Sequence, residues 1–450
     1  MITYSIIQKS QLEGALRLDA EYYQPEYLEV KKILTKIRHE PLKNFVGKII
    51  HPQEVKREYI ESGYLFLLSQ NLRENYLDFS DKFYIDDKTA KQITKNLLDN
   101  GDIVTVRTGN IGLSSVIWGF KEKIYASADV IVIKNPKISP FYISTFLNSK
   151  FGKLYLNRII YGALQPHITP KLLGEIPIPL LDKLSIRKIH ELIETALNNF
   201  KQSEVFYSQA ENLLLEELGL KDFKIEDDLS YIVNLSQIKS AHRADAEYFQ
   251  PKYEKILSKI KCKMERLVNL LMPKEGIRKG IEIGSEQYQE GGKLFIRVSN
   301  LSKHGLVDRD QKYLSEELYQ KLKKEFEPKV GEILLTKDAT PGIAYLLKES
   351  LKGIIAGGIL RLKAKPDINP EYLTLVINSV VGQIQVERDT GGSVIFHWRP
   401  DQIKNLLIPI LPKPTQQKIA DLVQKSHEAR KRAKQLLEEA KRKVEKLIEE

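Results

Sequence analysis

Sulfur-containing residues are scarce in this sequence. Its 450 residues include one cysteine, Cys262, and three methionines. A single cysteine excludes an intramolecular disulfide and a cysteine-based zinc site, so we expect Cys262 to be a small, partly buried apolar side chain. The N-terminal residues 1–6 also lack the basic stretch and apolar core of a secretion signal. These absences predict a cytoplasmic protein in a reducing environment.

Long hydrophobic runs are absent as well. No apolar stretch approaches the ~18 residues that a membrane-spanning helix needs. The chain is 42% hydrophobic and 29% charged, which is typical of a globular protein. Its length predicts two to four folding units, because a single hydrophobic core seldom grows this large.

The motifs of common catalysts and cofactor sites are missing too. The sequence has no Gly-x-Gly-x-x-Gly dinucleotide loop and no phosphate loop ending in Gly-Lys-Ser/Thr. Gly-x-Ser-x-Gly, His-Glu-x-x-His and the Asn-Pro-Pro-aromatic motif of amino-methyltransferases are likewise absent. The eight histidines show no metal-ligand spacing. We therefore expect no catalytic residue, no metal site and no cofactor bound by this chain, and we predict a binding protein.

The strongest feature that is present is a long internal repeat. The segment Arg17–Tyr27, RLDAEYYQPEY, returns 226 residues later as Arg243–Tyr253, RADAEYFQPKY. Further matches follow at an offset of 230 residues: Gly101 with Gly331, Asn148 with Asn378, Ser149 with Ser379, Gly162 with Gly392, His167 with His397, and Pro170 with Pro400. A repeat this long is one folding unit made twice. It predicts a protein that reads two like or related targets, one per module.

Both halves have the same predicted order of secondary structure. A helix is expected to begin near Pro25 and again near Pro251, because proline suits a first helical turn. Short β-branched segments predict strands at 103–106, 130–133, 333–336 and 359–362. Single helices are expected over about 140–155 and about 370–386, and the two prolines of Ile176–Pro179 suit a sheet edge. The pattern predicts an α+β fold of two tandem α/β modules.

Each half ends in a segment with the spacing of a coiled-coil seam. The first seam comprises Ile186, Ile189, Ile193, Ala196, Phe200, Ser203, Tyr207, Ala210 and Leu214; the second comprises Ile419, Val423, Ser426, Arg430, Ala433, Leu437, Ala440, Val444 and Leu447. Because both stripes are narrow, similar in length and flanked by charges, we predict that two long helices pair antiparallel with a pseudo-two-fold axis. The alternative is a helix packed on its own module. The predicted limits are 1–182 and 222–412 for the modules, and 183–221 and 413–450 for the helices.

The charge balance predicts a polyanionic partner. The chain has a formal net charge of +11 and a pI near 9.2, which favours a nucleic acid. Paired helices between two modules would also suit a two-part DNA target with fixed spacing, as in dimeric DNA readers.

Loops that follow the matched strands are the expected contact sites, because rigid strands position loops whose sequence is free to differ. Arg107–Asn110 and Lys337–Gly342 are one such pair, and Ser69–Arg73 and Arg297–Leu301 are another with a shared Asn-Leu core. Arginine pairs well with guanine, and asparagine or glutamine with adenine. The candidate DNA contacts are Gln70, Asn71, Arg73, Arg107, Thr108, Asn110, Gln165, His167, Arg297, Ser299, Asn300, Lys337, Thr340, His397 and Arg399.

Some repeated residues have two interpretations. His167 and His397 are either capping and packing residues or ligand contacts. The charged residues of the first repeat are too similar in the two halves to read different sequences, so they form structural ion pairs or contact a partner. These residues are Arg17, Asp19 and Glu21 with Arg243, Asp245 and Glu247.

The repeated order of these motifs resembles the specificity subunit of type I restriction–modification enzymes. The resemblance rests on tandem halves that each end in a long helix, on the strand-to-loop segments from Gly101 and Gly331, and on Gly162–Ile168 with Ile176–Pro179 after it. It covers almost the whole chain. Residues 392–398 depart from the pattern, because they lack the Gln-Pro that includes Gln165 in the first half.

This resemblance implies the biological setting. Each module would be a target recognition domain, and the helices would act as a ruler between two half-sites of double-stranded DNA. Two methyltransferase subunits and the restriction–translocase subunits would be the protein partners. S-adenosylmethionine, ATP and magnesium would then belong to those partners.

Two rival hypotheses stay open at this point. An autonomous DNA methyltransferase is one, although its cofactor and catalytic motifs are missing. A coiled-coil interaction protein without a nucleic-acid role is the other, although the basic charge and the divergent loops disfavour it. Steeply salt-dependent binding would favour DNA.

Overall fold

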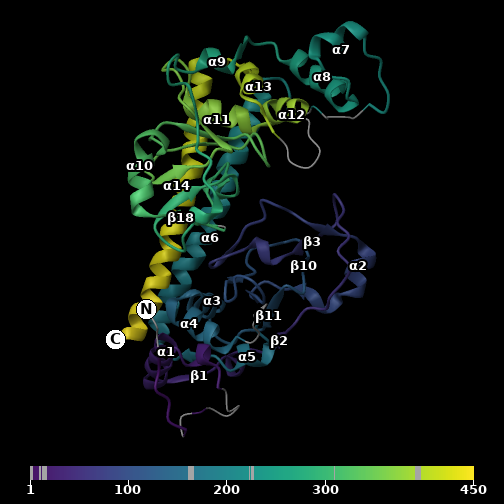
Figure 1. The fold of residues 1–450 in the computed structure, drawn as a ribbon. Helices are drawn as coiled ribbons and strands as arrows, with labels where there is room; N and C mark the ends of the chain where they lie inside the picture. Colours follow the sequence, from purple (N-terminus) through teal and green to yellow (C-terminus); the bar gives the residue numbers. More distant parts are fainter. Residues whose placement is uncertain are drawn as a thin grey trace. The chain divides into compact units, whose positions relative to one another are not determined.

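The computed structural model describes residues 4–9, 12, 18–160, 167–221, 223, 228–308, 310–390 and 397–450. The chain forms two compact units. Unit 1 consists of Met1–Lys201 with Arg430–Glu450, and unit 2 of Gln202–Ala429. Each unit combines short helices with small sheets, which confirms the predicted α+β fold of two tandem modules (Figure 1).

Unit 1 is built around a four-stranded antiparallel sheet. Its strand order is β2 (Lys48–Ile50), β11 (Val130–Lys134), β8 (Ile103–Val106) and β9 (Ser114–Val116). A second sheet has the order β6 (Tyr84–Ile85), β3 (Tyr64–Leu67), β10 (Ile124–Ala126) and β7 (Leu97–Leu98), with β3 and β10 parallel. Nearly every residue of β8, β9 and β11 is buried, so these strands form a rigid base for the loop after β8.

Unit 2 repeats this plan. Its antiparallel sheet has the order β14 (Ile277–Lys279), β22 (Ile359–Leu362), β19 (Ile333–Thr336) and β20 (Ala344–Leu346). The second sheet has the order β18 (Lys312–Leu314), β15 (Lys293–Ile296) and β21 (Gly353–Ile355), and β15 and β21 are again parallel. The strand β19 therefore occupies in unit 2 the place of β8 in unit 1.

Short helices complete each unit. In unit 1 they are α1 (Pro25–Lys36), α2 (Asp87–Gln92), α3 (Pro140–Asn148), α4 (Lys150–Ile159) and α5 (Pro170–Gly174). In unit 2 they are α7 (Leu235–Ala241), α8 (Pro251–Lys259), α9 (Leu267–Leu270), α10 (Glu316–Phe326), α11 (Pro370–Asn378), α12 (Val380–Asp389) and α13 (Pro400–Asn405). Helices α1 and α8 begin at their prolines, as predicted.

Short strands of two or three residues also pair into separate two-stranded sheets. These are β4 (Leu72–Arg73) with β5 (Tyr76–Leu77), β16 (Leu301–Ser302) with β17 (Gly305–Leu306), β1 (His39–Pro41) with β12 (Pro177–Pro179), and β13 (Met264–Arg266) with β23 (Leu407–Pro409). The proline-rich strand β12 lies in a two-stranded sheet, which confirms that it is an edge strand.

The single helices expected over 140–155 and 370–386 are each two helices, so that prediction is wrong. The chain breaks at Ser149 and Ser379, whose backbones are extended. The preceding side chain holds each break in place. Asn148 accepts a hydrogen bond from the Ser114 amide (2.9 Å) and donates one to the Ser114 carbonyl (2.7 Å). Asn378 makes the same pair with Ala344, at 2.9 and 2.8 Å.

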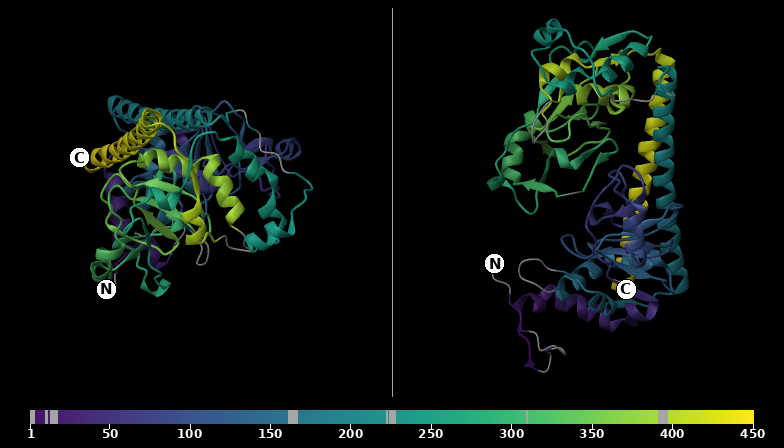
Figure 2. Two further views of the ribbon diagram at one scale, coloured as in Figure 1. Left: turned by 90° about the horizontal axis from the view of Figure 1, so that it is seen from above. Right: turned by 90° about the vertical axis from the view of Figure 1, so that its right-hand side faces the viewer.

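The long helices α6 (Lys183–Glu217) and α14 (Lys413–Glu449) pack against each other (Figure 2). In unit 1, the first half of α6 shares a hydrophobic cluster with the second half of α14. In unit 2, the second half of α6 shares one with the first half of α14. This arrangement confirms the antiparallel pairing.

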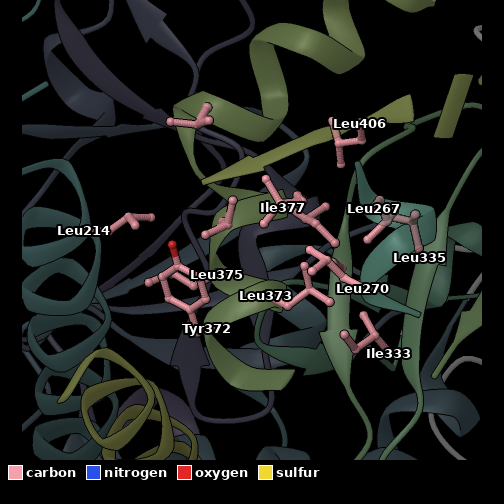
Figure 3. Close-up of a cluster of buried hydrophobic side chains, with 14 of the residues drawn as sticks. Leu214, Leu267, Leu270, Ile333, Leu335, Tyr372, Leu373, Leu375, Ile377 and Leu406 are labelled. Carbon is pink, nitrogen blue, oxygen red and sulfur yellow. The ribbon is translucent and has the colours of Figure 1, made fainter. Parts of the chain in front are cut away.

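The predicted seam residues are buried, with three exceptions that are half-buried: Ile186, Arg430 and Leu447. Arg430 is only half-buried and lies over the Phe200 ring, 5.3 Å from its centroid. Near the C-terminal end of α14, Ile448 is buried and Leu447 is half-buried. The main core of unit 2 continues from the seam into the sheet and α11, where Leu214, Leu335 and Tyr372 belong to one cluster (Figure 3).

Candidate nucleic-acid interface

The two loops that follow β8 and β19 have the same backbone conformation. Gly109 and Gly112 have φ angles of +81° and +90°, and Ala339 and Gly342 have +59° and +91°. The second residue of each pair, a glycine in both loops, also packs tightly: a Cβ would lie 2.8 Å from Leu156 at Gly112 and 2.9 Å from Val386 at Gly342. The two loops therefore share these backbone angles while their side chains differ.

A histidine-bearing segment pairs with each of these loops. Thr108 forms an antiparallel bridge with His167, and Asp338 forms the equivalent bridge with His397. The amide of Ile168 donates to the Arg107 carbonyl at 3.2 Å, and in unit 2 that of Trp398 donates to Lys337 at 2.8 Å. The backbone thus brings the predicted His167 and His397 next to the predicted loop residues.

In unit 2 this junction carries a charged cluster. His397 Nδ1 lies 2.8 Å from one carboxylate oxygen of Asp338, and Lys337 Nζ contacts the other. Although burial opposes ionisation, the hydrogen bonds from Lys337 and His397 lower the pKa of Asp338. His397 and Arg399 keep 63% and 68% of their side chains exposed, so both remain available to a ligand.

Unit 1 has different chemistry at the same junction. Thr108 stands where unit 2 has Asp338, and the amide of Arg107 donates to the Asp129 carbonyl at 3.0 Å. The carboxylate of Asp129 accepts a 2.8 Å hydrogen bond from Arg57. Arg57 is a candidate contact that the sequence reasoning missed, because it does not belong to the repeat and comes from a distant segment.

The second pair of loops is held by buried asparagines. Asn71 is 1% exposed and accepts from the Leu68 amide while donating to the carbonyls of Asp78 and Asp81. Asn300 is also 1% exposed and accepts from the Arg297 amide. Both side chains hydrogen-bond the backbone of their own loop, and contact of Asn71 and Asn300 with bases stays a prediction.

The arginines of this second pair of loops are partly engaged as well. Arg73 donates to the carbonyls of Gln70 (2.7 Å) and Leu72 (2.8 Å) and pairs with Asp78 at 3.2 Å. Arg297 pairs with Asp310 at 2.7 Å. Hydrogen bonds from Arg297 and Lys312 lower the pKa of Asp310 to about 2. Contact between these arginines and DNA would require exchange of existing ion pairs.

Gly358 lies close to both loops of unit 2. A Cβ at this position would lie 2.8 Å from Val298 and 3.4 Å from the Asp338 carboxylate. The structure therefore brings the Arg297–Leu301 loop beside the Lys337–Gly342 loop, which the sequence did not indicate.

The exposure of the other candidates varies. Asn110, Ser299 and Thr340 are exposed, whereas Gln70, Arg107, Thr108, His167 and Lys337 are half-buried. Gln165 lies outside the described residues. Within the described ranges, no cluster of histidine, cysteine, aspartate and glutamate has the grouping of a metal site. Of the helices described, none is long and apolar enough to cross a membrane.

Two family models match this chain, one in each half. Residues 42–178 match a TaqI-like C-terminal specificity domain. Residues 276–442 match a type I restriction modification DNA specificity domain. No match was found among curated proteins.

Solved structures of specificity subunits are similar over most of the chain. The S subunit of a type I restriction–modification system from M. genitalium is 12% identical, with a TM-score of 0.42, over 90% of this chain and 95% of that one. The HsdS subunit from Thermoanaerobacter tengcongensis is 13% identical, with a TM-score of 0.28, over 91% and 95% of the two chains. Each half of the chain thus matches a DNA specificity-domain model, and the chain as a whole resembles the specificity subunits of type I restriction–modification systems.

Proposed function

We propose that this chain reads a bipartite DNA sequence for a type I restriction–modification complex, with one unit for each half-site. The observation that carries the proposal is that the loops after β8 and β19 share a backbone conformation but differ in their side chains. Arg107 and Thr108 of unit 1 correspond to Lys337 and Asp338 of unit 2 on equivalent strands. A shared backbone conformation would hold each loop in the same position on the DNA, while different side chains would select different bases.

The charge and the helices support the same proposal. A net charge of +11 favours binding to phosphates. The pairing of α6 with α14 provides a defined length of coiled coil, which suits a target whose two parts are separated by a fixed gap. The exposed candidates Asn110, Thr340 and Arg399 are the first residues to test for DNA contact.

The remaining parts of the proposal concern partners. The chain would act as a non-catalytic subunit in the cytoplasm and dock two methyltransferase subunits, which the restriction–translocase subunits join. S-adenosylmethionine, ATP and magnesium would be bound by those partners.

The test is co-expression with the methyltransferase subunit of the same system, followed by mapping of methylated adenines in the host genome. A two-part motif with a constant gap is the expected result. Exchange of unit 2 loops 297–301 and 337–342 for those of a relative should change one part of the motif only.

The contrary results are equally clear. Methylation by the purified chain alone would identify an autonomous methyltransferase. A complex that binds S-adenosylmethionine but prefers no DNA sequence in a titration would contradict sequence recognition.

A further inference from the structure

An aspartate lies at the loop junction of each unit, but the two aspartates are not equivalent in the repeat. Asp129 of unit 1 precedes β11, and Gly358 takes its place before β22 in unit 2. Both backbone carbonyls accept a hydrogen bond from the loop: Asp129 from the amide of Arg107 at 3.0 Å, and Gly358 from that of Lys337 at 2.9 Å. The two positions therefore match in structure, although only one of them has a side chain.

In unit 2 the carboxylate comes from the other segment of the junction. Asp338 lies in the loop, where unit 1 has Thr108. A Cβ at Gly358 would lie 3.4 Å from a carboxylate oxygen of Asp338, so this carboxylate lies beside the position that carries Asp129 in unit 1. Both units thus keep an acidic group at the junction, although they supply it from different segments of the repeat.

Each carboxylate holds an accessible side chain that carries nitrogen. Asp129 accepts a hydrogen bond from Nη2 of Arg57 at 2.8 Å, and the Arg57 side chain is 40% exposed. A second carboxylate, that of Glu54, lies 3.9 Å from the same nitrogen. In unit 2, Asp338 lies 2.8 Å from Nδ1 of the exposed His397. The carboxylate therefore orients a different side chain in each unit.

The segment that carries Arg57 is fixed to the turn before β11. His51 Nε2 lies 2.9 Å from the carbonyl oxygen of Ala128. The backbone of Gln53 exchanges two hydrogen bonds with the side chain of the buried Asn96, at 2.8 and 2.9 Å. Arg57 is thus held in place by its backbone as well as by its carboxylate partner.

His397 is held in a similar way. The side chain of Trp398 is buried, and its amide donates to the Lys337 carbonyl at 2.8 Å. Lys337 Nζ contacts the second carboxylate oxygen of Asp338. With Nδ1 directed to Asp338, Nε2 is the ring nitrogen that can meet a ligand.

The fold uses another arginine more fully. Arg243, in the repeated segment before α8, makes two hydrogen bonds with Asp245, at 2.9 and 2.6 Å, and donates to the Asp389 carbonyl at 3.1 Å. Its side chain is 22% exposed, and its counterpart Arg17 lies outside the described residues. By contrast, the bond to Asp129 uses one of the five N–H groups of Arg57, which leaves a pair that can meet a base edge.

We propose that Arg57 and His397 are specificity-determining side chains, one in each unit, and that Asp129 and Asp338 are positioning residues that orient them. The inference rests on the proposed function and names a group that reads DNA in each half-site. Arg57 contacts a guanine, because two parallel N–H groups match its O6 and N7 acceptors. His397 contributes one hydrogen bond, from Nε2 to a base edge.

Orientation by a carboxylate matters for base discrimination. A side chain that is already held in its binding geometry loses less conformational entropy when DNA binds, and it cannot shift easily to suit a wrong base. A contact with a base edge changes the preference for one base pair, whereas a contact with a phosphate changes the affinity for every sequence. The two kinds of contact are therefore separable by measurement.

The test measures base discrimination by the assembled complex of the full chain with its methyltransferase subunits. Kd is titrated for a duplex with the mapped motif and for duplexes in which one base pair is replaced. Arg57→Ala should lose at least about tenfold of the discrimination at one guanine in the half-site of unit 1, which is the half that the unit 2 loop exchange leaves unchanged. Arg57→Lys should lose it too, since lysine lacks the two-pronged donor. His397→Ala should lose about three- to tenfold at one position in the other half.

The positioning residues have a separate readout. Asp129→Asn should weaken discrimination at the same guanine as Arg57→Ala, and the two changes together should cost no more than Arg57→Ala alone. Asp338→Asn should behave in the same way toward His397→Ala. A carboxylate with a merely structural role would lower stability without this shared, non-additive effect on one base pair.

The matched control is an arginine–carboxylate pair of the same length on α6. Arg187 donates to Glu191 at 2.8 Å, and both side chains are exposed. Arg187→Ala and Glu191→Gln should retain every discrimination ratio of the wild type. Melting temperatures above the assay temperature would show that all variants are folded during the titration.

Full discrimination by Arg57→Ala and His397→Ala, in a complex whose wild type reads a two-part motif, would overturn the inference and leave the proposed function intact. An equal loss of affinity for every duplex would identify phosphate contacts and would overturn it as well. Relaxation of an A·T position by Arg57→Ala would contradict the guanine contact. A wild-type complex that prefers no DNA sequence would instead contradict the proposed function itself.

Discussion

Ser426 donates a hydrogen bond from its hydroxyl to the backbone carbonyl oxygen of Ser203 at 2.7 Å, across the pair of long helices. The two hydroxyl oxygens lie 3.0 Å apart, and both side chains are 0% exposed. Since the Ser426 proton points to the carbonyl, Ser203 supplies the proton between the hydroxyls. A buried polar pair in an apolar seam is satisfied in one alignment only, so it specifies the register of α6 and α14.

Substitution of Ser426 by alanine should lower the free energy of unfolding by about 2 kcal/mol, because the Ser203 hydroxyl and carbonyl lose partners in a buried position. The double variant Ser203→Ala with Ser426→Ala should cost less than the sum of the single variants, with a coupling of about 1 kcal/mol. Urea denaturation of the four proteins measures this cycle. Exposed Ser208→Ala is the control, and strictly additive single effects would contradict the register pair.

Ala339→Gly should stabilise the protein. Its φ of +59° costs an alanine about 1–2 kcal/mol, while glycine loses about 0.4–1 kcal/mol more entropy on folding. The expected net gain is about 0.5–1 kcal/mol. Gly109→Ala is the matched reverse change, because no atom lies within 4 Å of a Cβ built there. It should destabilise by about 1 kcal/mol in the same thermal unfolding assay, and equal signs for both variants would refute the backbone argument.

Asp338→Asn should destabilise unit 2 at neutral pH by on the order of 1 kcal/mol, since Lys337 and His397 lose a charged acceptor. The folded pKa of Asp338 lies below the ordinary aspartate value of 3.8. Its carboxylate therefore contributes stability above pH 3.8, and that contribution disappears as the pH falls through the lower folded value. Urea titrations from pH 7 down to pH 3 should show the two proteins converging, and a constant difference would contradict the assignment.

Arg399→Ala tests contact with DNA phosphates. The Arg399 side chain is 68% exposed and its pairing with Asp401 at 3.4 Å is exposed as well, so the guanidinium is available. We expect weaker binding to all DNA sequences and a salt-dependence slope reduced by about 1. The control Arg187→Ala, at a side chain 77% exposed on α6, should leave the slope unchanged. An unchanged slope for Arg399→Ala would remove it from the interface.

The candidate loops show how far residue types predict roles. Loop positions were accessible to prediction because β-branched strands precede them at equivalent points of the repeat. The roles of Asn71 and Asn300 could not be predicted, because an asparagine side chain can hydrogen-bond a base edge or a buried loop backbone equally well. Arg57 was not predicted because it is linked to the Arg107 loop only by way of Asp129. That residue accepts hydrogen bonds from both arginines, which come from segments far apart in the sequence.

The sequence by itself determined the duplication, the α+β class and the antiparallel seam, because repeats and hydrophobic periodicity are local properties of a chain. Tertiary structure alone decided the helix breaks at Ser149 and Ser379, where an asparagine side chain binds a strand more than thirty residues away. It also separated Asp245, which pairs with Arg243, from Glu247, which faces solvent. Two acidic residues that the repeat preserves equally acquire different roles when folding gives one a partner and leaves the other exposed, and that difference depends on contacts that sequence spacing does not encode.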